Sequence, residues 1–329
     1  MPATYPQLLV GVDIGGSKIA VLVVDDDLTI VGRRRVPTPV GEAGSAPERI
    51  EAAIVAALPP GTSLEDVRAV GVGVPGQVEL DGGRIALAAN LGWHEFALGE
   101  LLSHRLGIPV VVENDVRAAA AGIHQRRLIG PVDDLIYLGV GTGIAAGVVL
   151  DGRLRRGTRG LAGEIGHAVV DPGGDLCECG MRGCLETVAA GRAIARRAGR
   201  TDAGEVFKAA AAGDPLAQTV VEDAGRHLAS AIHLLALAYG VDAVVIGGGV
   251  ARAGAPFLEP IVRELDRFRA ASELNAAILP DGFVQLVPAG DETGAWGAVL
   301  SARRVPVPAE ARRSKQEVRD RVVSPEPSA

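Results

Sequence analysis

Aromatic residues are scarce in this chain: they make up 3% of its 329 residues, although hydrophobic residues reach 48%. Its cores must therefore be built mainly from Ala, Val, Leu and Ile. Long apolar runs are also missing, since none reaches the 18 residues typical of a membrane-spanning helix. The N-terminal stretch "MPATYPQLLVG" lacks the basic start and the cleavage site of a signal peptide. The sequence thus predicts a cytoplasmic protein without a membrane partner.

Positive charge is in short supply as well. The formal net charge is −7 at pH 7, whereas a general nucleic-acid surface needs a basic field. We therefore expect a small-molecule substrate and no nucleic-acid partner.

Cysteine is the third scarce residue, and all three copies lie close together at Cys177, Cys179 and Cys184. An odd number cannot be fully paired in disulfides, and a reducing compartment fits unpaired thiols. With His167 shortly before them, the three thiolates make a complete Cys₃His set, which is typical of a structural Zn²⁺. Three unrelated reduced thiols are the alternative. A catalytic zinc is less favoured, because no coordination position is left for water.

The 44 glycines include two similar stretches, "LLVGVDIGGSKIAVLVVDDDLTIVG" and "LIYLGVGTGIAAGVVLDGRLRRG". Gly11 falls on Gly139 and Gly15 on Gly143. In each stretch, β-branched runs flank a glycine turn, which is typical of strands joined by tight turns. We predict an internal repeat in which each half of the chain begins with such a β-meander.

Between and after these stretches, strands alternate with helical segments. Helices are expected around residues 46–58, 98–106 and 256–270, and strands in "VRAVGVGVPG", "PVVVEND" and "DAVVIGGG". This alternation indicates an α/β fold. Residues 304–329 are polar, contain proline and lack an apolar period, so they are predicted to form a disordered tail.

The stretch "GVDIGGSK" has the glycine spacing of a P-loop, but Ser17 and Lys18 come in the wrong order and a strand-like run follows. We therefore exclude a P-loop. One remaining interpretation is a glycine turn that needs a positive φ and nothing else. The other is a turn whose backbone N–H groups face phosphate oxygens, with Asp13 placed to hold Mg²⁺. A second such loop, "GVGTGIAAG", favours nucleotide binding, and Thr142 adds a hydroxyl there.

These features together describe the actin-like, hexokinase-like ATPase fold. Within it, "LIYLGVGTGIAAGVVLDGRLRRGTRGLAGEIGH" followed by "CECGMRGCLE" closely resembles the signature of the ROK family (repressor, open reading frame, kinase), over roughly residues 8–300. The resemblance implies two α/β domains with a sugar- and nucleotide-binding cleft between them. Residues 1–117 would form the small domain, joined by a helix near 291–303. Residues 118–290 would form the large domain with the zinc loop.

The resemblance also assigns roles to residues. Locally, the Asn-Asp pair before the helix at 115 reads most simply as a helix cap. In the family, the Asp of this "END" stretch is the general base, which points to Asp115. The expected sugar-binding residues are Gly76, Asn90, Asn114, Asp115, Glu164, His167 and Glu186. The expected ATP- and Mg²⁺-binding residues are Asp13, Gly15, Gly16, Ser17, Lys18, Gly141, Thr142, Gly143, Gly248 and Gly249.

By resemblance, the chain is expected to be an ATP-dependent hexose kinase, in particular a glucokinase that forms the 6-phosphate, and a homodimer. Alternatives with the same chemistry are an amino sugar, allose, fructose or a C7-cyclitol as acceptor. A sugar-sensing regulator is the rival from another class. It would need an N-terminal helix-turn-helix domain, for which the strand expected from Leu8 leaves no room. One departure from the family is Ala145-Ala146, where many relatives have glycine.

Overall fold

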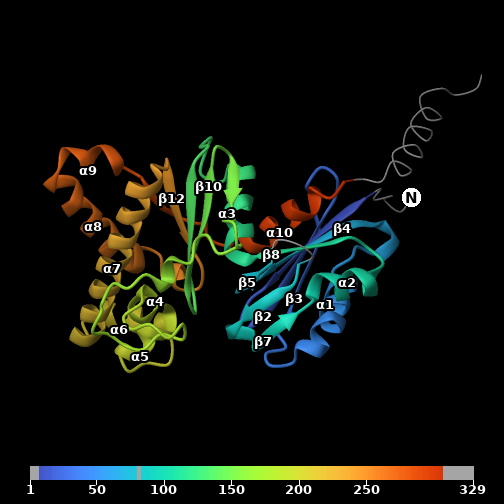
Figure 1. The fold of residues 1–329 in the computed structure, drawn as a ribbon, viewed down its shortest axis with the longest axis horizontal. Coiled ribbons are helices and arrows are strands. Elements are labelled where there is room, and N and C mark those ends of the chain that lie inside the picture. The colour runs from blue at the N-terminus through green and yellow to red at the C-terminus, as the bar shows by residue number, and fades with distance from the viewer. Residues whose placement is uncertain (1–6, 80–82, 307–329) are drawn as a thin grey trace, which may run out of the picture.

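Two five-stranded sheets and one three-stranded sheet organise the computed structural model, which describes residues 7–79 and 83–306 (Figure 1). In sheet order, the first contains β3 (Ile30–Pro37), β2 (Lys18–Val24), β1 (Leu8–Ile14), β4 (Val67–Val74) and β8 (Val110–Asn114). The second contains β11 (Arg153–Arg155), β10 (Ile144–Leu150), β9 (Leu135–Val140), β12 (Ala243–Gly247) and β13 (Val284–Leu286). The small sheet contains β5 (Gln77–Val78), β6 (Ile85–Ala88) and β7 (Trp93–Phe96).

The two large sheets have the same plan. In each, an antiparallel meander of three strands continues into two parallel strands, so that β1 and β9 occupy the central position. Gly11 and Gly139 lie at matching places in these central strands, as the sequence alignment of the two stretches predicts. The internal repeat is therefore visible in the sheet topology.

The outer face of each sheet is covered by helices (Figure 1). The first sheet packs on α1 (Ala46–Val55) and α2 (Leu98–Leu106), and Ile50 and Leu102 on these helices are fully buried. The second sheet forms a larger core with helices that follow the second meander. These are α4 (Leu185–Ala189), α5 (Gly191–Arg197), α6 (Ala203–Ala211), α7 (Pro215–Tyr239) and α8 (Ala255–Ala271), with α9 (Glu273–Ile278) against α8.

The inner faces are covered by one helix each. Helix α10 (Thr293–Arg303) packs on the first sheet, and α3 (Asp115–Gln125) packs on the second. The two helices cross between the sheets (Figure 1), where the Cα of Gly297 lies 2.9 Å from the Cβ position of Gly122. A side chain at either glycine would push the helices apart, so this crossing sets how closely the two sheets approach.

The structure is thus α/β, as the sequence predicts, and the expected helices and strands form within a few residues of their predicted bounds. We keep the division into two domains as a proposal, with α10 joining the first sheet. No helix among the described residues has the length and apolar character needed to cross a membrane. Most of the predicted tail, residues 307–329, lies outside the described residues.

Candidate active site

Two carboxylates stand at neighbouring strand ends in the first sheet. Asp13 is near the end of β1, and Asp115 directly follows β8; the parallel strand β4 lies between them. Gly73 of β4 pairs with both Asp13 and Glu113. Its Cβ position is only 3.5 Å from the Cα of Asp115 and 3.8 Å from the carbonyl oxygen of Val12. Gly73 therefore leaves the space between the two aspartates free of side chain.

Both carboxyl groups are surrounded by protein atoms, although each residue as a whole is only half-buried. Burial, and to a smaller extent the nearby charge of Asp13, raise the pKa of Asp115 to about 7. Burial also raises the pKa of Asp13 to about 6, while the Lys18 ammonium opposes this shift. A carboxylate with a pKa near neutrality suits a proton acceptor, and a buried pair of acids suits a cation.

The helix cap next to Asp115 is made by the preceding residue. The Asn114 side-chain oxygen accepts a hydrogen bond from the backbone N–H of Arg117 at 3.0 Å, and its amide donates to the carbonyl of Gly76 at 3.1 Å. Asp115 is the first helical residue, and its carboxylate accepts from the N–H of Val116 at 2.9 Å. Asp115 is therefore not needed as the cap, which leaves its carboxylate available for chemistry. Asn114 uses both side-chain atoms to hold Gly76 and the start of α3.

The glycines of the two hairpin loops are not required by a left-handed backbone conformation. Gly15, Gly16, Gly141 and Gly143 are absent from the residues with positive φ. A Cβ at Gly16 would have no protein atom within 4 Å, and a Cβ at Gly141 would have its nearest neighbour at 4.0 Å. The space beside Gly16 and Gly141 is not filled by the protein, which favours backbone contact with a ligand over a purely conformational role at these two positions.

Lys18, at the end of the first hairpin loop, lies in a positively charged environment. Burial lowers its pKa, and the charges of Arg252 and Arg35 lower it further. Arg252 belongs to the short 3₁₀ helix η5 (Val250–Ala253), which follows a third glycine loop, residues 247–249 at the end of β12. The first hairpin loop and the third glycine loop therefore bring Lys18 and Arg252 together from the two large sheets. Such a field fits phosphate oxygens.

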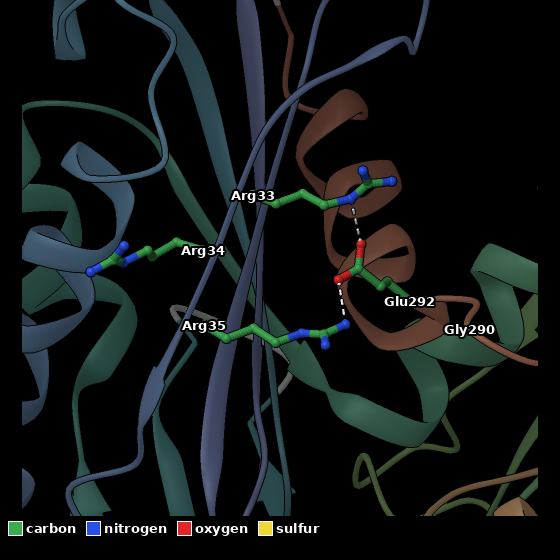
Figure 2. Close-up of a pocket in the computed structure, with 5 residues that line it drawn as sticks. All are labelled: Arg33, Arg34, Arg35, Gly290 and Glu292. Carbon is green, nitrogen blue, oxygen red and sulfur yellow. Dashed lines mark hydrogen bonds and ion pairs between the residues drawn. The ribbon is translucent and has the colours of Figure 1, made fainter.

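An open cavity of about 430 Å³ adjoins this region, on the side of the edge strand β3 (Figure 2). Arg33 and Arg35 point from β3 to Glu292, whose oxygens lie 3.0 and 2.8 Å from the two guanidinium groups. Arg34 points to the opposite side of the strand, as side-chain alternation requires (Figure 2). Glu292 thus already pairs with two of the three arginines, and we assign the cavity no ligand.

Sequence reasoning missed Gly294, which lies against the Asp13 carboxyl group in the first turn of α10. A Cβ at this position would stand 2.6 Å from the Cγ of Asp13 and within 2.7 Å of both its oxygens. The absence of a side chain is therefore what admits the Asp13 carboxylate at the start of this helix. No signal in one sequence could identify this, because the two residues are far apart along the chain.

We expect Gly294→Ala to raise the Mg²⁺ concentration needed for half-maximal activity by about tenfold or more, because the added methyl group displaces Asp13. Alanine favours a helix over glycine by about 1 kcal/mol, so the loss should come without a lower melting temperature. A magnesium titration of activity and a thermal melt would check both points. Gly44→Ala, where the Cβ position has no neighbour within 4 Å, is the control. Unchanged magnesium dependence would contradict this role of Gly294.

The second hairpin loop meets the third glycine loop and the start of α5. Gly191 donates its N–H to the carbonyl of Gly141 at 2.8 Å, and the N atom of Gly249 lies 4.0 Å from the Cβ position of Gly141. Gly248 has a φ of +95°, and its Cβ position would lie 2.3 Å from the Val140 carbonyl oxygen. The predicted nucleotide loops after β9 and β12 therefore come together, and Gly248 is needed for their close packing.

The predicted sugar-binding residue Asn90 lies beside this second loop. Its amide nitrogen is 3.4 Å from the Thr142 hydroxyl, and Arg192 donates to its side-chain oxygen at 3.2 Å. Asn90, in the segment before β7, thus lies next to Thr142, a predicted nucleotide-binding residue. This contact lies where the predicted sugar site and the predicted nucleotide site meet. Arg192, which the sequence did not single out, connects Asn90 to the Thr142 carbonyl at 3.4 Å.

Glu164, His167 and Glu186 come together in the structure. Glu164 precedes the 3₁₀ helix η4 (Ile165–His167), and Glu186 lies in the first turn of α4. The His167 Nδ1 atom is 3.6 Å from Glu186 Oε1, and burial raises the pKa of Glu164 while His167 lowers it. Glu186 Oε2 also lies 3.1 Å from the Cβ position of Gly143. The predicted sugar carboxylates therefore border the second hairpin loop.

His167 and the three cysteines form a compact cluster, and their ligand atoms all lie within 4.8 Å of one another. His167 Nδ1 is 3.5 Å from Cys177 Sγ, and the sulfurs of Cys179 and Cys184 are 3.6 Å apart. Zn–S and Zn–N bonds of about 2.0–2.3 Å place tetrahedral ligands roughly 3.5 Å apart, so the donor set fits a zinc ion. Gly183 makes the tight loop possible, since a Cβ there would overlap the Asp171 carbonyl oxygen.

Comparison with known proteins places these features in a family. The ROK family model matches residues 9–305. The chain is 36% identical over 284 residues to a glucokinase of Halalkalibacterium halodurans, which covers 79% of this chain and 85% of that protein. It is 38% identical over 246 residues to an N-acetylmannosamine kinase of Citrobacter koseri, with 73% of this chain and 82% of that protein covered.

A solved structure is similar over most of its length. The ROK family glucokinase from Streptomyces griseus in complex with glucose and AMPPNP superposes with a TM-score of 0.75 at 33% identity. The match covers 90% of this chain and 99% of that one.

Proposed function

The chain belongs to the ROK family, and we propose that it is an ATP-dependent hexose kinase that phosphorylates the 6-hydroxyl of glucose. The observation that carries this proposal is the pair Asp13 and Asp115 on either side of β4, together with the glycine loops in which Gly16 and Gly141 leave open space. The relatives named glucokinase support the choice of acceptor.

In this mechanism, Asp115 accepts the proton of the sugar hydroxyl. The hydroxyl oxygen then forms a bond to the γ-phosphorus of ATP, while the bond from that phosphorus to the bridging oxygen breaks and ADP leaves. Asp115 must be ionised to accept the proton, and its pKa of about 7 lies near the operating pH, where general bases work best. Lys18 and the open hairpin loops bind the phosphates.

Asp13 is the residue that would hold Mg²⁺, directly or through water. Its buried carboxyl group is favoured in the ionised form by a nearby cation, which fits a metal-binding role. When bound, the ion neutralises charge on the phosphate oxygens. Asp13 would also affect the proposed base, because a cation bound at Asp13 would lower the cost of ionising the neighbouring Asp115 carboxyl group.

We also propose a structural zinc at His167, Cys177, Cys179 and Cys184. The Nδ1 atom of His167 is the nitrogen beside Cys177 Sγ, which leaves Nε2 as a donor to a sugar hydroxyl. Metal binding at this cluster would hold Glu164, His167 and Glu186 as one wall of the sugar site. A cytoplasmic homodimer completes the proposal by family resemblance.

The second candidate acceptor is N-acetylmannosamine, because a relative with this named activity is 38% identical. We expect purified protein to phosphorylate glucose in a reaction that requires both ATP and Mg²⁺, with a kcat/KM for glucose above that for N-acetylmannosamine, allose, fructose and a C7-cyclitol. A coupled ADP-release assay over this panel measures the order. Preference for another acceptor would change the substrate assignment. Absence of transfer to every acceptor, with binding of operator DNA, would replace the kinase by a regulator.

A further inference from the structure

A buried ionic cluster lies directly beneath the site and takes no part in the mechanism above. Glu113 is the last residue but one of β8, and 5% of its surface is exposed. Its Oε1 atom accepts from Arg117 Nε at 2.9 Å, and its Oε2 atom accepts from Arg156 Nε at 2.5 Å. One carboxylate of the first sheet is thus shared by two guanidinium groups from different segments.

Arg117 is the most buried member of the cluster, with 1% of its surface exposed. It lies on α3, two residues after Asp115 and directly after the start of the helix. Besides Glu113, its Nη1 atom donates to the carbonyl oxygen of Gly160. The side chain therefore connects the strand that precedes the base to a loop of the second sheet.

That loop is residues 156–164, which joins β11 to Glu164. Arg156 at its start is bound by Glu113, and Gly160 in its middle is bound by Arg117. At its end, the Gly163 carbonyl accepts from the N–H of Ala146 in β10 at 2.7 Å. The first two of these three ties converge on the cluster next to Asp115, so the cluster holds the start and the middle of the loop that leads to Glu164.

We propose that Arg117 is a positioning residue for the sugar acceptor. Its side chain connects the loop 156–164 to Glu113 and so keeps Glu164 at a fixed position relative to Asp115. The inference rests on the proposed kinase function for its catalytic readout. Arg117 touches neither substrate nor reacting atoms in this role. It acts through the loop backbone and through the strand that carries Glu113.

The hydrogen bonding of Arg117 argues against a role in stability alone. Its buried Nη2 atom has no hydrogen-bond partner among the described residues, and an unsatisfied buried donor is destabilising. An apolar side chain of similar volume would pack there without that cost, but it could not bind the Gly160 carbonyl and Glu113 together. The guanidinium group therefore fixes the position of the loop relative to β8, because its donors point in fixed directions toward both Glu113 and the Gly160 carbonyl.

The test uses Arg117→Lys and Arg156→Gln. Lysine retains the charge but cannot reach Glu113 and Gly160 at once, and Arg156 is 37% exposed, so its replacement threatens folding less. Loss of a charged hydrogen bond that holds the loop lowers the population of its sugar-binding position by about tenfold or more. The apparent affinity for sugar falls by the same factor. We expect the KM for sugar to rise about tenfold in both variants, while the KM for ATP stays within about twofold of the wild type. Backbone amides of residues 157–164 should exchange hydrogen faster.

Arg155→Gln is the matched control, because Arg155 is the adjacent arginine and its partner Asp151 is 81% exposed. It should leave both KM values and the exchange of the loop unchanged. Parallel increases in the KM for sugar and for ATP, with a lower melting temperature, would show a merely structural cluster and overturn the proposal. Unchanged exchange in Arg156→Gln would overturn it independently of activity. A wild type that phosphorylates no sugar would refute the kinase proposal, while the exchange measurement would still decide about the loop.

Discussion

Asp115→Asn is expected to lower kcat by at least ~10²-fold, the scale of a general-base contribution, and to leave the KM for sugar nearly unchanged. The amide has the shape of the carboxylate and can still hydrogen-bond a sugar hydroxyl, but it cannot accept the proton. The cap of α3 is made by Asn114, so the helix does not depend on the replaced residue. Steady-state kinetics with glucose and ATP measure the split.

The pH dependence gives the same substitution a second readout. Burial raises the pKa of Asp115 from 3.8 to about 7 in the folded protein, so the wild-type kcat/KM for sugar, which reports the groups of the free enzyme, should fall as the pH drops below about 7. Between pH 4 and pH 7, the folded protein retains a proton that the unfolded chain has released. Stability from this group is therefore complete below about pH 4 and is lost as the pH rises through 7. Asn cannot ionise, so Asp115→Asn should melt at a higher temperature than the wild type at pH 8, with a smaller gain at pH 5.

Asp281→Asn is a suitable control, because the Asp281 side chain is 99% exposed and its replacement should change neither kcat nor the pH profile. An Asp115→Asn enzyme that retains most of its kcat would show that Asp115 only occupies the first turn of α3. A wild-type kcat/KM that stays constant from pH 8 to pH 5 would contradict the raised pKa of Asp115 in the free enzyme.

Cys179→Ser is expected to abolish zinc binding and to raise the KM for sugar by about tenfold or more. The wild type should contain about one zinc per chain by metal analysis. Loss of one of four ligands removes a closed tetrahedral site. For the sugar site the zinc acts as a support, and loss of groups that orient functional residues costs about 10–100-fold. Glu164, His167 and Glu186 would loosen together. The KM for ATP should rise less than the KM for sugar, because Glu186 borders the second hairpin loop, whereas Gly15, Gly16 and Lys18 lie on the other sheet.

Met181→Leu is the control for this experiment. Met181 lies between Cys179 and Cys184, its side chain is exposed, and it is outside the proposed ligand set. It should retain zinc and normal sugar binding. Absence of zinc from the wild type would end the zinc proposal. A metal-free Cys179→Ser enzyme with normal sugar affinity would show that the metal does not shape the sugar site.

The sequence by itself determined the class of the fold and the nature of its chemistry. Alternating apolar runs and glycine turns predict strands and helices through local periodicity, and the two similar stretches predict the repeated meander that β1–β3 and β9–β11 form. A set of candidate metal ligands that lies within a short segment, such as the Cys₃His set, can also be recognised from its spacing alone. The resemblance of the glycine and cysteine motifs to one family supplied the activity.

Only the tertiary structure decided which groups meet across long separations in the chain. The spacing could not show that Gly294 admits the Asp13 carboxylate, or that Gly122 and Gly297 set the crossing of α3 and α10. It also could not distinguish Asn114 from Asp115 as the helix cap, since both residue types cap helices well. The physical reason is that a pKa, a close backbone approach and an ion pair such as Arg117–Glu113 depend on burial and distance. These are properties of the packed chain, because they arise from neighbours that the linear order does not specify.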